Sequence, residues 1–203
     1  LNLPGKPSDM PTKQAAAAVG QCELMYTYDR LFLQYNHTVA QILLTGEDVD
    51  DDERRQNFEN TIERLLELGA LPIINENDTV ITAEIKVGDN DTLGAIVAKS
   101  IRADLLVLLS DIEGLYTADP RKDPGAQLIP VVEEVTPEIE ALAGGVGSGL
   151  ATGGMATKIR AAKTVTAVGC DMIITNGSHP EVLYDIAQGK AVGTRFVGRK
   201  GSV

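Results

Sequence analysis

The alternation of short apolar runs with amphipathic stretches most limits the folds available to this chain. Apolar runs at 39–44, 71–74, 105–109 and 172–175 are separated by segments whose apolar residues recur every three or four positions. Such runs are typical of buried strands, and the amphipathic segments are typical of helices that cover a sheet. The order predicts an α/β fold, in which 105–109 has the composition of a central parallel strand. With 43% apolar residues, we expect 1–203 to form a single domain.

Cap residues and breakers indicate where the helices begin and end. The acidic turn 47–53 precedes a helical repeat that stops at Gly69, so we interpret Asp50 to Asp52 as N-cap and helix-dipole residues rather than metal ligands. Segment 112–135 carries glycines and prolines without helical periodicity, which predicts a loop with a hairpin. The remaining helices are expected at 13–35, 91–101, 136–143, 155–168 and after Pro180.

The charge balance excludes several classes of partner. The formal net charge is −11 without any dense Lys/Arg run, which argues against nonspecific nucleic-acid and anionic-membrane binding. Neither a membrane-spanning run nor a signal peptide is apparent, so we expect a cytoplasmic protein. Cys22 and Cys170 lack a Cys-x-x-Cys spacing, which favours core or near-core thiols over a disulfide framework or a zinc site.

Two Asn/Asp clusters lie between the apolar run at 71–74 and the helical repeat after it. Asn75 and Asp78 follow the strand, and Asn90 and Asp91 precede the helix. In open α/β sheets, ligands bind at the carboxyl ends of strands, and helix starts offer free N–H groups to anions. These clusters therefore predict a site for a small polar ligand. The alternative for either cluster alone is an Asx-rich turn with capping residues.

The segment 144–158 contains six glycines and places Lys158 in the first turns of a helix. Glycines let backbone N–H groups approach phosphate oxygens, which favours a phosphate-binding loop. The stretch matches neither the P-loop, which needs Lys directly after its last glycine, nor the dinucleotide fingerprint. The alternative is a flexible loop that ends near an ordinary surface lysine.

A third polar element follows the strand at 105–109. Ser110 and Asp111, with the stretch 113–120 (EGLYTADP), lie where a nucleotide base or ribose could bind, although a plain turn explains this element equally well in isolation.

Taken in order, INENDTV with KVGDND, LLVLLSD-x-EGLYTADP and GSGLATGGMATK closely resemble the glutamate 5-kinase branch of the amino acid kinase family. The resemblance runs from about Lys13 to Phe196. It implies a three-layer αβα sandwich around a mainly parallel central sheet. It also implies ATP-dependent phosphorylation of the L-glutamate side-chain carboxylate to glutamyl 5-phosphate, the first step of proline biosynthesis.

The resemblance assigns roles to individual residues. Asp78 would contact the substrate ammonium, Asn90 a carboxylate, and Asn75 would support their loop. The nucleotide would contact Ser110, Asp111, Thr152, Gly153, Gly154, Met155, Ala156, Thr157 and Lys158.

Lys158 has a physical case of its own. A carboxylate that attacks a triphosphate must overcome charge repulsion, so preorganised positive charge supplies much of the catalysis. Asp91 would then orient cationic groups, or would serve only as the N-cap of its helix. Mg²⁺ would be held mainly by phosphate oxygens, so no dedicated metal ligands are predicted.

Other expectations concern completeness and partners. The family's catalytic lysine on a glycine-rich strand end and its Thr-Ser-Gly motif are not found after Leu1, so we expect a preceding segment in the natural protein and no activity from this chain alone. The resemblance also implies a homo-oligomer, feedback inhibition by proline and an association with glutamyl phosphate reductase. The alternatives are a sister kinase for aspartate, acetylglutamate or uridylate, and a noncatalytic ligand-sensing module.

Overall fold

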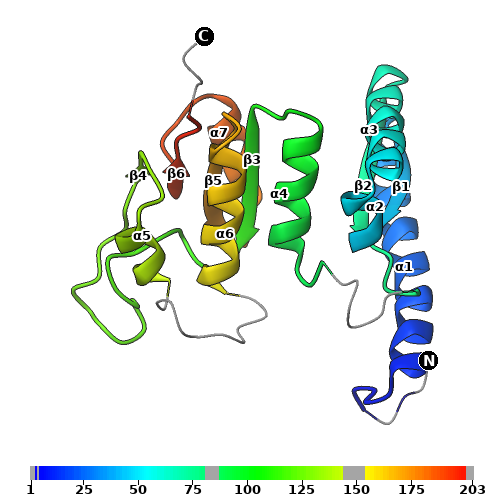
Figure 1. The fold of residues 1–203 in the computed structure, drawn as a ribbon, viewed down its shortest axis with the longest axis horizontal. Helices are drawn as coiled ribbons and strands as arrows, with labels where there is room; N and C mark the ends of the chain where they lie inside the picture. The colour runs from blue at the N-terminus through cyan, green and yellow to red at the C-terminus, as the bar shows by residue number, and fades with distance from the viewer. Residues whose placement is uncertain (1–2, 4, 81–86, 144–153, 200–203) are drawn as a thin grey trace. The chain divides into compact units, whose positions relative to one another are not determined.

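The computed structural model describes the chain except residues 1–2, 4, 81–86, 144–153 and 200–203 (Figure 1). Its contacts divide the chain into two compact units, unit 1 at Leu1–Asn90 and unit 2 at Asp91–Val203. The expectation of a single domain over 1–203 stays a prediction.

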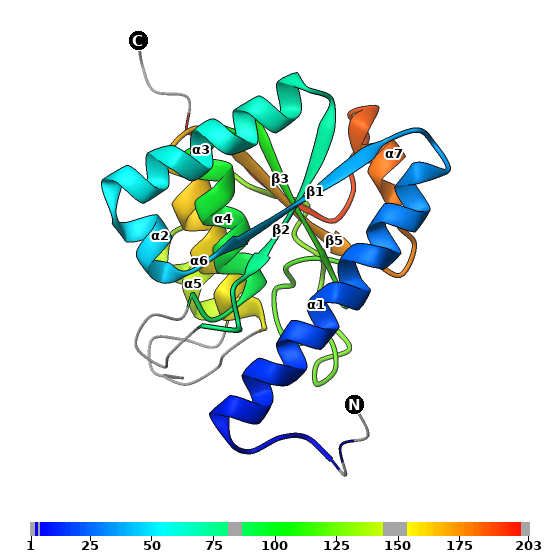
Figure 2. The same ribbon diagram turned by 90° about the vertical axis from the view of Figure 1, so that its right-hand side faces the viewer.

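Unit 1 is built around two parallel strands. β1 (Thr38–Leu44) pairs with β2 (Ala70–Glu76), in a register that joins Thr38 to Ala70 and Leu44 to Glu76. The helix α1 (Met10–Leu33) packs on β1, and α3 (Asp52–Glu67) packs on β2. Figure 2 shows the two helices on opposite sides of the strands. This arrangement brings the end of β2, with Asn75 and Glu76, beside α1.

The acidic turn between β1 and α3 contains the predicted caps. Thr45 and Asp48 form a capping box at the start of α2 (Gly46–Asp50), and the Asp51 side chain accepts the Arg54 N–H at the start of α3. Burial acts to raise the pKa of Asp48, but hydrogen bonds from Thr45 and the Arg54 guanidinium together hold it below the usual carboxyl value. Gly69 adopts a φ of 73° just past α3, as its predicted role as a helix stop requires.

Unit 2 holds a four-stranded sheet in the order β3-β5-β6-β4. β3 and β5 are parallel, β4 and β6 are parallel, and β5 and β6 are antiparallel. Figure 2 shows α4 and α6 on one side of β3 and β5 and α7 on the other. The bounds are α4 (Asn90–Ser100), β3 (Leu105–Ser110), β4 (Val131–Val132), α5 (Pro137–Leu142), α6 (Met155–Thr166), β5 (Asp171–Asn176), α7 (Val182–Ala187) and β6 (Thr194–Phe196).

The core of unit 2 lies between this sheet and the faces of α4 and α6. Alanines on both helices alternate with larger side chains, which permits close packing on the strands. The core residues are Ala95, Ala98, Leu108, Leu115, Val132, Ile159, Ala161, Ala162, Val165, Cys170, Met172, Ile174 and Phe196. Ile159 belongs to this core and Met155 packs against it, so the core anchors the start of α6 next to Lys158.

The α/β fold with helices on both sides of mainly parallel strands is confirmed. The hairpin predicted within 112–135 is also present, because Tyr116 bridges Leu128 and Thr117 N–H donates to the Gln127 carbonyl at 2.9 Å. The buried hydroxyl of Thr194 anchors this hairpin by accepting the Leu115 N–H at 2.8 Å and donating to the Ile129 carbonyl at 2.6 Å.

Further predictions have mixed outcomes. Within unit 2, β3 is the end strand of the described sheet, with Leu105 and Leu109 exposed, and its position as a central strand stays a prediction. Cys22 is exposed on α1, whereas Cys170 is buried as predicted, and burial raises the pKa of its thiol. The short strands β4 and β6 were not anticipated, because two or three residues are too few to show periodicity.

Among the described residues, no helix combines the length and the apolar character needed to cross a bilayer.

Candidate functional site

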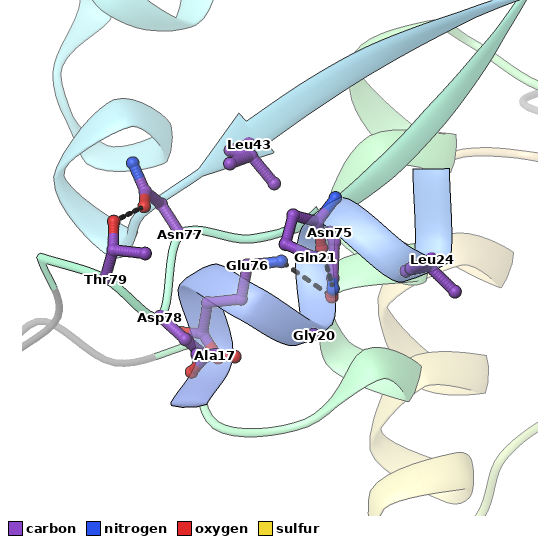
Figure 3. Close-up of a pocket in the computed structure, with 10 residues that line it drawn as sticks. All are labelled: Ala17, Gly20, Gln21, Leu24, Leu43, Asn75, Glu76, Asn77, Asp78 and Thr79. Carbon is purple, nitrogen blue, oxygen red and sulfur yellow. Dashed lines mark hydrogen bonds between the residues drawn. The ribbon is translucent and has the colours of Figure 1, made fainter. Parts of the chain in front are cut away.

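A pocket of about 280 Å³ lies in unit 1 between the end of β2 and α1 (Figure 3). We call it the NEND pocket, because all four residues of that motif line it. Its lining residues are Ala17, Gly20, Gln21, Leu24, Leu43, Asn75, Glu76, Asn77, Asp78 and Thr79. The volume suits a small polar molecule, and the structure brings together the predicted substrate residues Asn75 and Asp78 there.

Asn75 is held by hydrogen bonds on both sides of its amide. Its Oδ1 accepts the Glu76 N–H at 2.9 Å, and its Nδ2 donates to Gln21 Oε1 at 3.1 Å. Gln21 in turn donates from Nε2 to Gln41 Oε1 at 3.1 Å. A side chain that belongs to α1, 54 residues earlier in the chain, therefore supports the predicted binding residue.

Asp78 differs from Asn75 in having no hydrogen-bond or ion-pair partner among the described residues, although its side chain is only partly exposed. Such a carboxylate favours a cation, since a partner would compensate its loss of hydration. In Figure 3, Asp78 and Glu76 lie toward Ala17, whereas Asn75 and Gln21 lie toward Leu24. The pocket thus has an acidic end and an amide end.

Three hydrogen bonds shape the chain around Asp78. Glu76 is buried, with 9% of its surface exposed, and its Oε1 accepts the Val87 N–H at 2.6 Å. Asn77 donates its N–H to the Leu44 carbonyl at 2.8 Å, and its Oδ1 accepts the Thr79 hydroxyl at 2.6 Å. The motif therefore contains residues that build the pocket wall as well as residues that are free to meet a ligand.

The second cluster divides between two environments. Asn90 is exposed at the first position of α4 and is not one of the residues that line the NEND pocket. Asp91 follows it in the first turn of α4, so its side chain does not occupy the N-cap position that the alternative reading gave it. Its carboxylate is used in tertiary contacts instead.

Asp91 Oδ2 accepts hydrogen bonds from two residues at the start of α6. Lys158 Nζ lies 2.9 Å away, and the Thr157 hydroxyl lies 2.6 Å away. Only 13% of the Lys158 side chain and 19% of the Asp91 side chain are exposed. Thr157 is fully buried and also lies 2.8 Å from the Gly154 carbonyl, but its single proton favours the charged acceptor. The pair thus holds a lysine ammonium in one position at a helix start.

The beginning of α6 has the features of an anion site. Gly154 occupies the N-cap with a φ of 90°, and no side chain in the described part of the chain caps the helix. The first N–H groups of a helix lack intrahelical partners, so here they are available to phosphate oxygens. Met155 packs against the core, Ala156 is half-buried, and the predicted nucleotide contacts Thr152 and Gly153 lie outside the described residues.

Ser110 and Asp111 lie at the carboxyl end of β3, as predicted. The Ser110 hydroxyl donates to Asp111 Oδ1 at 3.2 Å, and the Ser110 carbonyl accepts the Gly177 N–H at 2.8 Å. Asp111 is exposed and lies 3.7 Å from the Arg121 guanidinium. Asn176, at the adjacent end of β5, donates to Glu113 Oε1 at 2.8 Å. This edge is polar and accessible, although nothing in its geometry selects one ligand.

Sequence reasoning missed the contribution of α1 to the NEND pocket. Ala17, Gly20, Gln21 and Leu24 follow the helical spacing of one face, and two of them are small. A glutamine beside small residues on an otherwise apolar face was the available signal. The sequence predicted that Asp91 orients cationic groups, which agrees with its contact to Lys158. It did not predict the buried hydroxyl of Thr157 as a second donor.

The profile of the amino acid kinase family matches residues 3–176. The chain belongs to this family.

Relatives similar to this chain share one name. A glutamate 5-kinase from Clostridium tetani is 56% identical over 97% of this chain and 73% of its own length. A glutamate 5-kinase from Clostridium perfringens is 49% identical over 99% of this chain and 76% of its own length. The chain therefore spans about three quarters of the length of these two relatives.

Solved structures agree on the fold. Carbamate kinase from Giardia lamblia bound to AMP-PNP has a TM-score of 0.64 at 21% identity, covering 95% of this chain and 75% of that one. An isopentenyl phosphate kinase has a TM-score of 0.59 at 18% identity, covering 87% of this chain and 66% of that one. At such low identity these likenesses show the fold alone.

Proposed function

We propose that this protein is a kinase that transfers the γ-phosphoryl group of ATP to the side-chain carboxylate of L-glutamate. The product is glutamyl 5-phosphate, the first intermediate towards proline. The observation that carries the proposal is the 56% identity to a glutamate 5-kinase over 97% of the chain. The NEND pocket and the Asp91–Lys158 pair supply two kinds of chemistry that this reaction needs.

The NEND pocket is the proposed acceptor site. The carboxylate of Asp78, for which the described residues provide no partner, suits the substrate ammonium, and the Asn75 amide suits a carboxylate oxygen. Asn90, which is exposed outside the pocket lining, is proposed to contact a substrate carboxylate as well. A pocket with an acidic end and an amide end matches an amino acid, which carries a cation and an anion on the same carbon.

The start of α6 is the proposed site of the transferring phosphoryl group. Its uncapped N–H groups bind phosphate oxygens, and Lys158 neutralises charge that accumulates as the carboxylate attacks. Asp91 orients the ammonium through a 2.9 Å contact, which limits the reorganisation needed at the moment of reaction. Ser110 and Asp111 are proposed to contact the nucleotide.

Mg²⁺ is proposed to accompany ATP and to offset charge on its phosphate oxygens. Those oxygens would be its main ligands, and we propose no dedicated metal ligand in this chain. The start of α6 and the nearby Lys158 both attract negative charge, which fits the binding of a metal-bound triphosphate that remains anionic.

Assembly and regulation are proposals that rest on the resemblance of the sequence to the family. Exposed apolar side chains on α1, among them Leu31 and Leu33, support a homo-oligomer. Feedback inhibition by proline, association with glutamyl phosphate reductase and a cytoplasmic location remain predictions.

Trapping of an acyl phosphate tests the proposed reaction. The natural protein is incubated with ATP, Mg²⁺, L-glutamate and hydroxylamine, and the hydroxamate is measured. We expect product that requires glutamate and is lost in Lys158→Ala. Aspartate, acetylglutamate and UMP are offered in parallel with ATP consumption as the readout. Turnover with one of them instead would identify a sister kinase, and ligand binding without any turnover would identify a sensing module.

A further inference from the structure

The amide of Asn75 can adopt only one orientation in the NEND pocket. The Glu76 backbone N–H is a donor and cannot accept, so the oxygen of the Asn75 amide must face it at 2.9 Å. The nitrogen then points the other way, toward an acceptor. Gln21 supplies that acceptor with its Oε1, at 3.1 Å from Asn75 Nδ2.

The orientation of Gln21 is determined in the same manner. Because its oxygen is used by Asn75, its Nε2 faces outward and donates to Gln41 Oε1 at 3.1 Å. Three side chains from α1, β1 and β2 thus form one directed chain of hydrogen bonds. Gln21 lines the pocket, whereas Gln41 is exposed and is not among the lining residues.

We infer that Gln21 is a positioning residue for acceptor recognition. One Nδ2 hydrogen of Asn75 is used by Gln21, and the other is left for a ligand oxygen in the pocket. Gln21 therefore keeps the Asn75 Nδ2 group directed as a donor. A ligand carboxylate can accept from this group, whereas a ligand group that only donates cannot. This role rests on the proposed function, because glutamate is the carboxylate ligand in question.

Steady-state kinetics of Gln21→Met test the inference. Methionine has a similar size but is only a weak acceptor for Asn75, so the amide is held by the Glu76 N–H alone and its Nδ2 side is no longer fixed. We expect the KM for glutamate to rise about tenfold, while kcat and the KM for ATP change less than about twofold. The same replacement at Gln34, an exposed glutamine at the end of α1, serves as the matched control and is expected to leave both KM values unchanged.

A double variant separates positioning from direct contact. If Gln21 acts through Asn75, then adding Gln21→Met to Asn75→Ala causes no further rise in the KM for glutamate. Gln41→Met should produce a smaller rise than Gln21→Met, and Gln41→Glu, which keeps an acceptor for Gln21, should restore the wild-type value. An unchanged KM in Gln21→Met, or full additivity with Asn75→Ala, overturns the inference.

A spectroscopic readout distinguishes failure of this inference from failure of the proposed function. The side-chain NH₂ resonances of Asn75, assigned with Asn75→Ala, report the amide directly in the ligand-free protein. In Gln21→Met we expect the resonance of the Nδ2 proton that Gln21 accepts to shift toward the value of an asparagine amide in water, because its acceptor is lost. If the natural protein does not use glutamate but these resonances move, the proposed function fails and the positioning role stands. If they do not move, the positioning role fails whatever the substrate.

Discussion

The NEND pocket and the Asp91–Lys158 pair are organised by different kinds of interaction. The pocket, in unit 1, is organised by hydrogen bonds between neutral amides, and its Asp78 carboxylate has no partner among the described residues. The pair, in unit 2, consists of two opposite charges that are mostly buried and satisfied by each other. Neutral hydrogen bonds distinguish donor from acceptor groups on a ligand and contribute little free energy each. A buried charge, by contrast, strongly stabilises an opposite charge that develops during a reaction. We therefore expect changes in the pocket to alter KM and changes in the pair to alter kcat.

The largest effect is expected from Lys158→Ala. Loss of a preorganised cation at the transferring phosphoryl group should lower kcat about 100- to 1,000-fold. Lys163→Ala, also on α6 but exposed in an ion pair with Glu140, is the matched control and should retain activity. Hydroxamate formation measures both, and a Lys158→Ala protein with near-normal kcat would remove the distinction between the two regions.

Asp91→Asn should have the next largest effect. The substitution keeps an oxygen for Thr157 but removes the charge that holds Lys158, so kcat should fall about 10- to 100-fold with little change in the KM for glutamate. The free energy of unfolding should decrease by about 2 kcal/mol, because a mostly buried ammonium loses its counter-charge. In a cycle with Lys158→Met the two losses should not add, and additive losses would show that the residues act independently.

Asn75→Asp tests the direction of the amide end of the pocket. The substitution replaces a donor with a charged acceptor of the same shape, which would face the substrate carboxylate and the Gln21 oxygen. The KM for glutamate should rise by about tenfold or more, whereas kcat at saturation should change less. Kinetics at varied glutamate provide the measurement, and a kcat loss with an unchanged KM would contradict the division of roles.

The smallest functional effect is expected from Asp48→Ala, which lies outside both regions. Loss of the capping box should lower the free energy of unfolding by about 1 kcal/mol at neutral pH while leaving both KM values unchanged. Asp52→Ala, which removes an exposed carboxylate nearby, should change stability less than about 0.5 kcal/mol.

The stability difference at Asp48 should depend on pH. The pKa of Asp48 lies below its usual value in the folded state, so its stabilisation is complete above the usual carboxyl range and is lost as pH falls through the lowered value. Denaturant titrations of the wild type and Asp48→Ala between neutral and acidic pH should therefore converge at low pH. A constant difference over this range would assign the stabilisation to packing.

Local signals predicted most of the elements correctly. Thr136 and Pro137 correctly marked the start of α5, and Gly169 marked the end of α6 with a φ of 87°. These signals depend on a few neighbouring residues, which a sequence displays directly. β6 was missed because its three residues are placed by pairing with β5 and β4, partners that lie far away in the sequence.

The sequence by itself determined the residue types of the candidate site and the strand ends and helix starts on which they lie. Asn75, Asp78, Asp91 and Lys158 belong to motifs whose order is visible in one dimension. Only the tertiary structure decided which of them meet, and which other side chains support them. The 67-residue separation of Asp91 from Lys158 and the 54-residue separation of Gln21 from Asn75 are closed by the packing of strands and helices. Hydrogen bonds and ion pairs act over a few ångströms of space, whatever distance separates the partners along the chain.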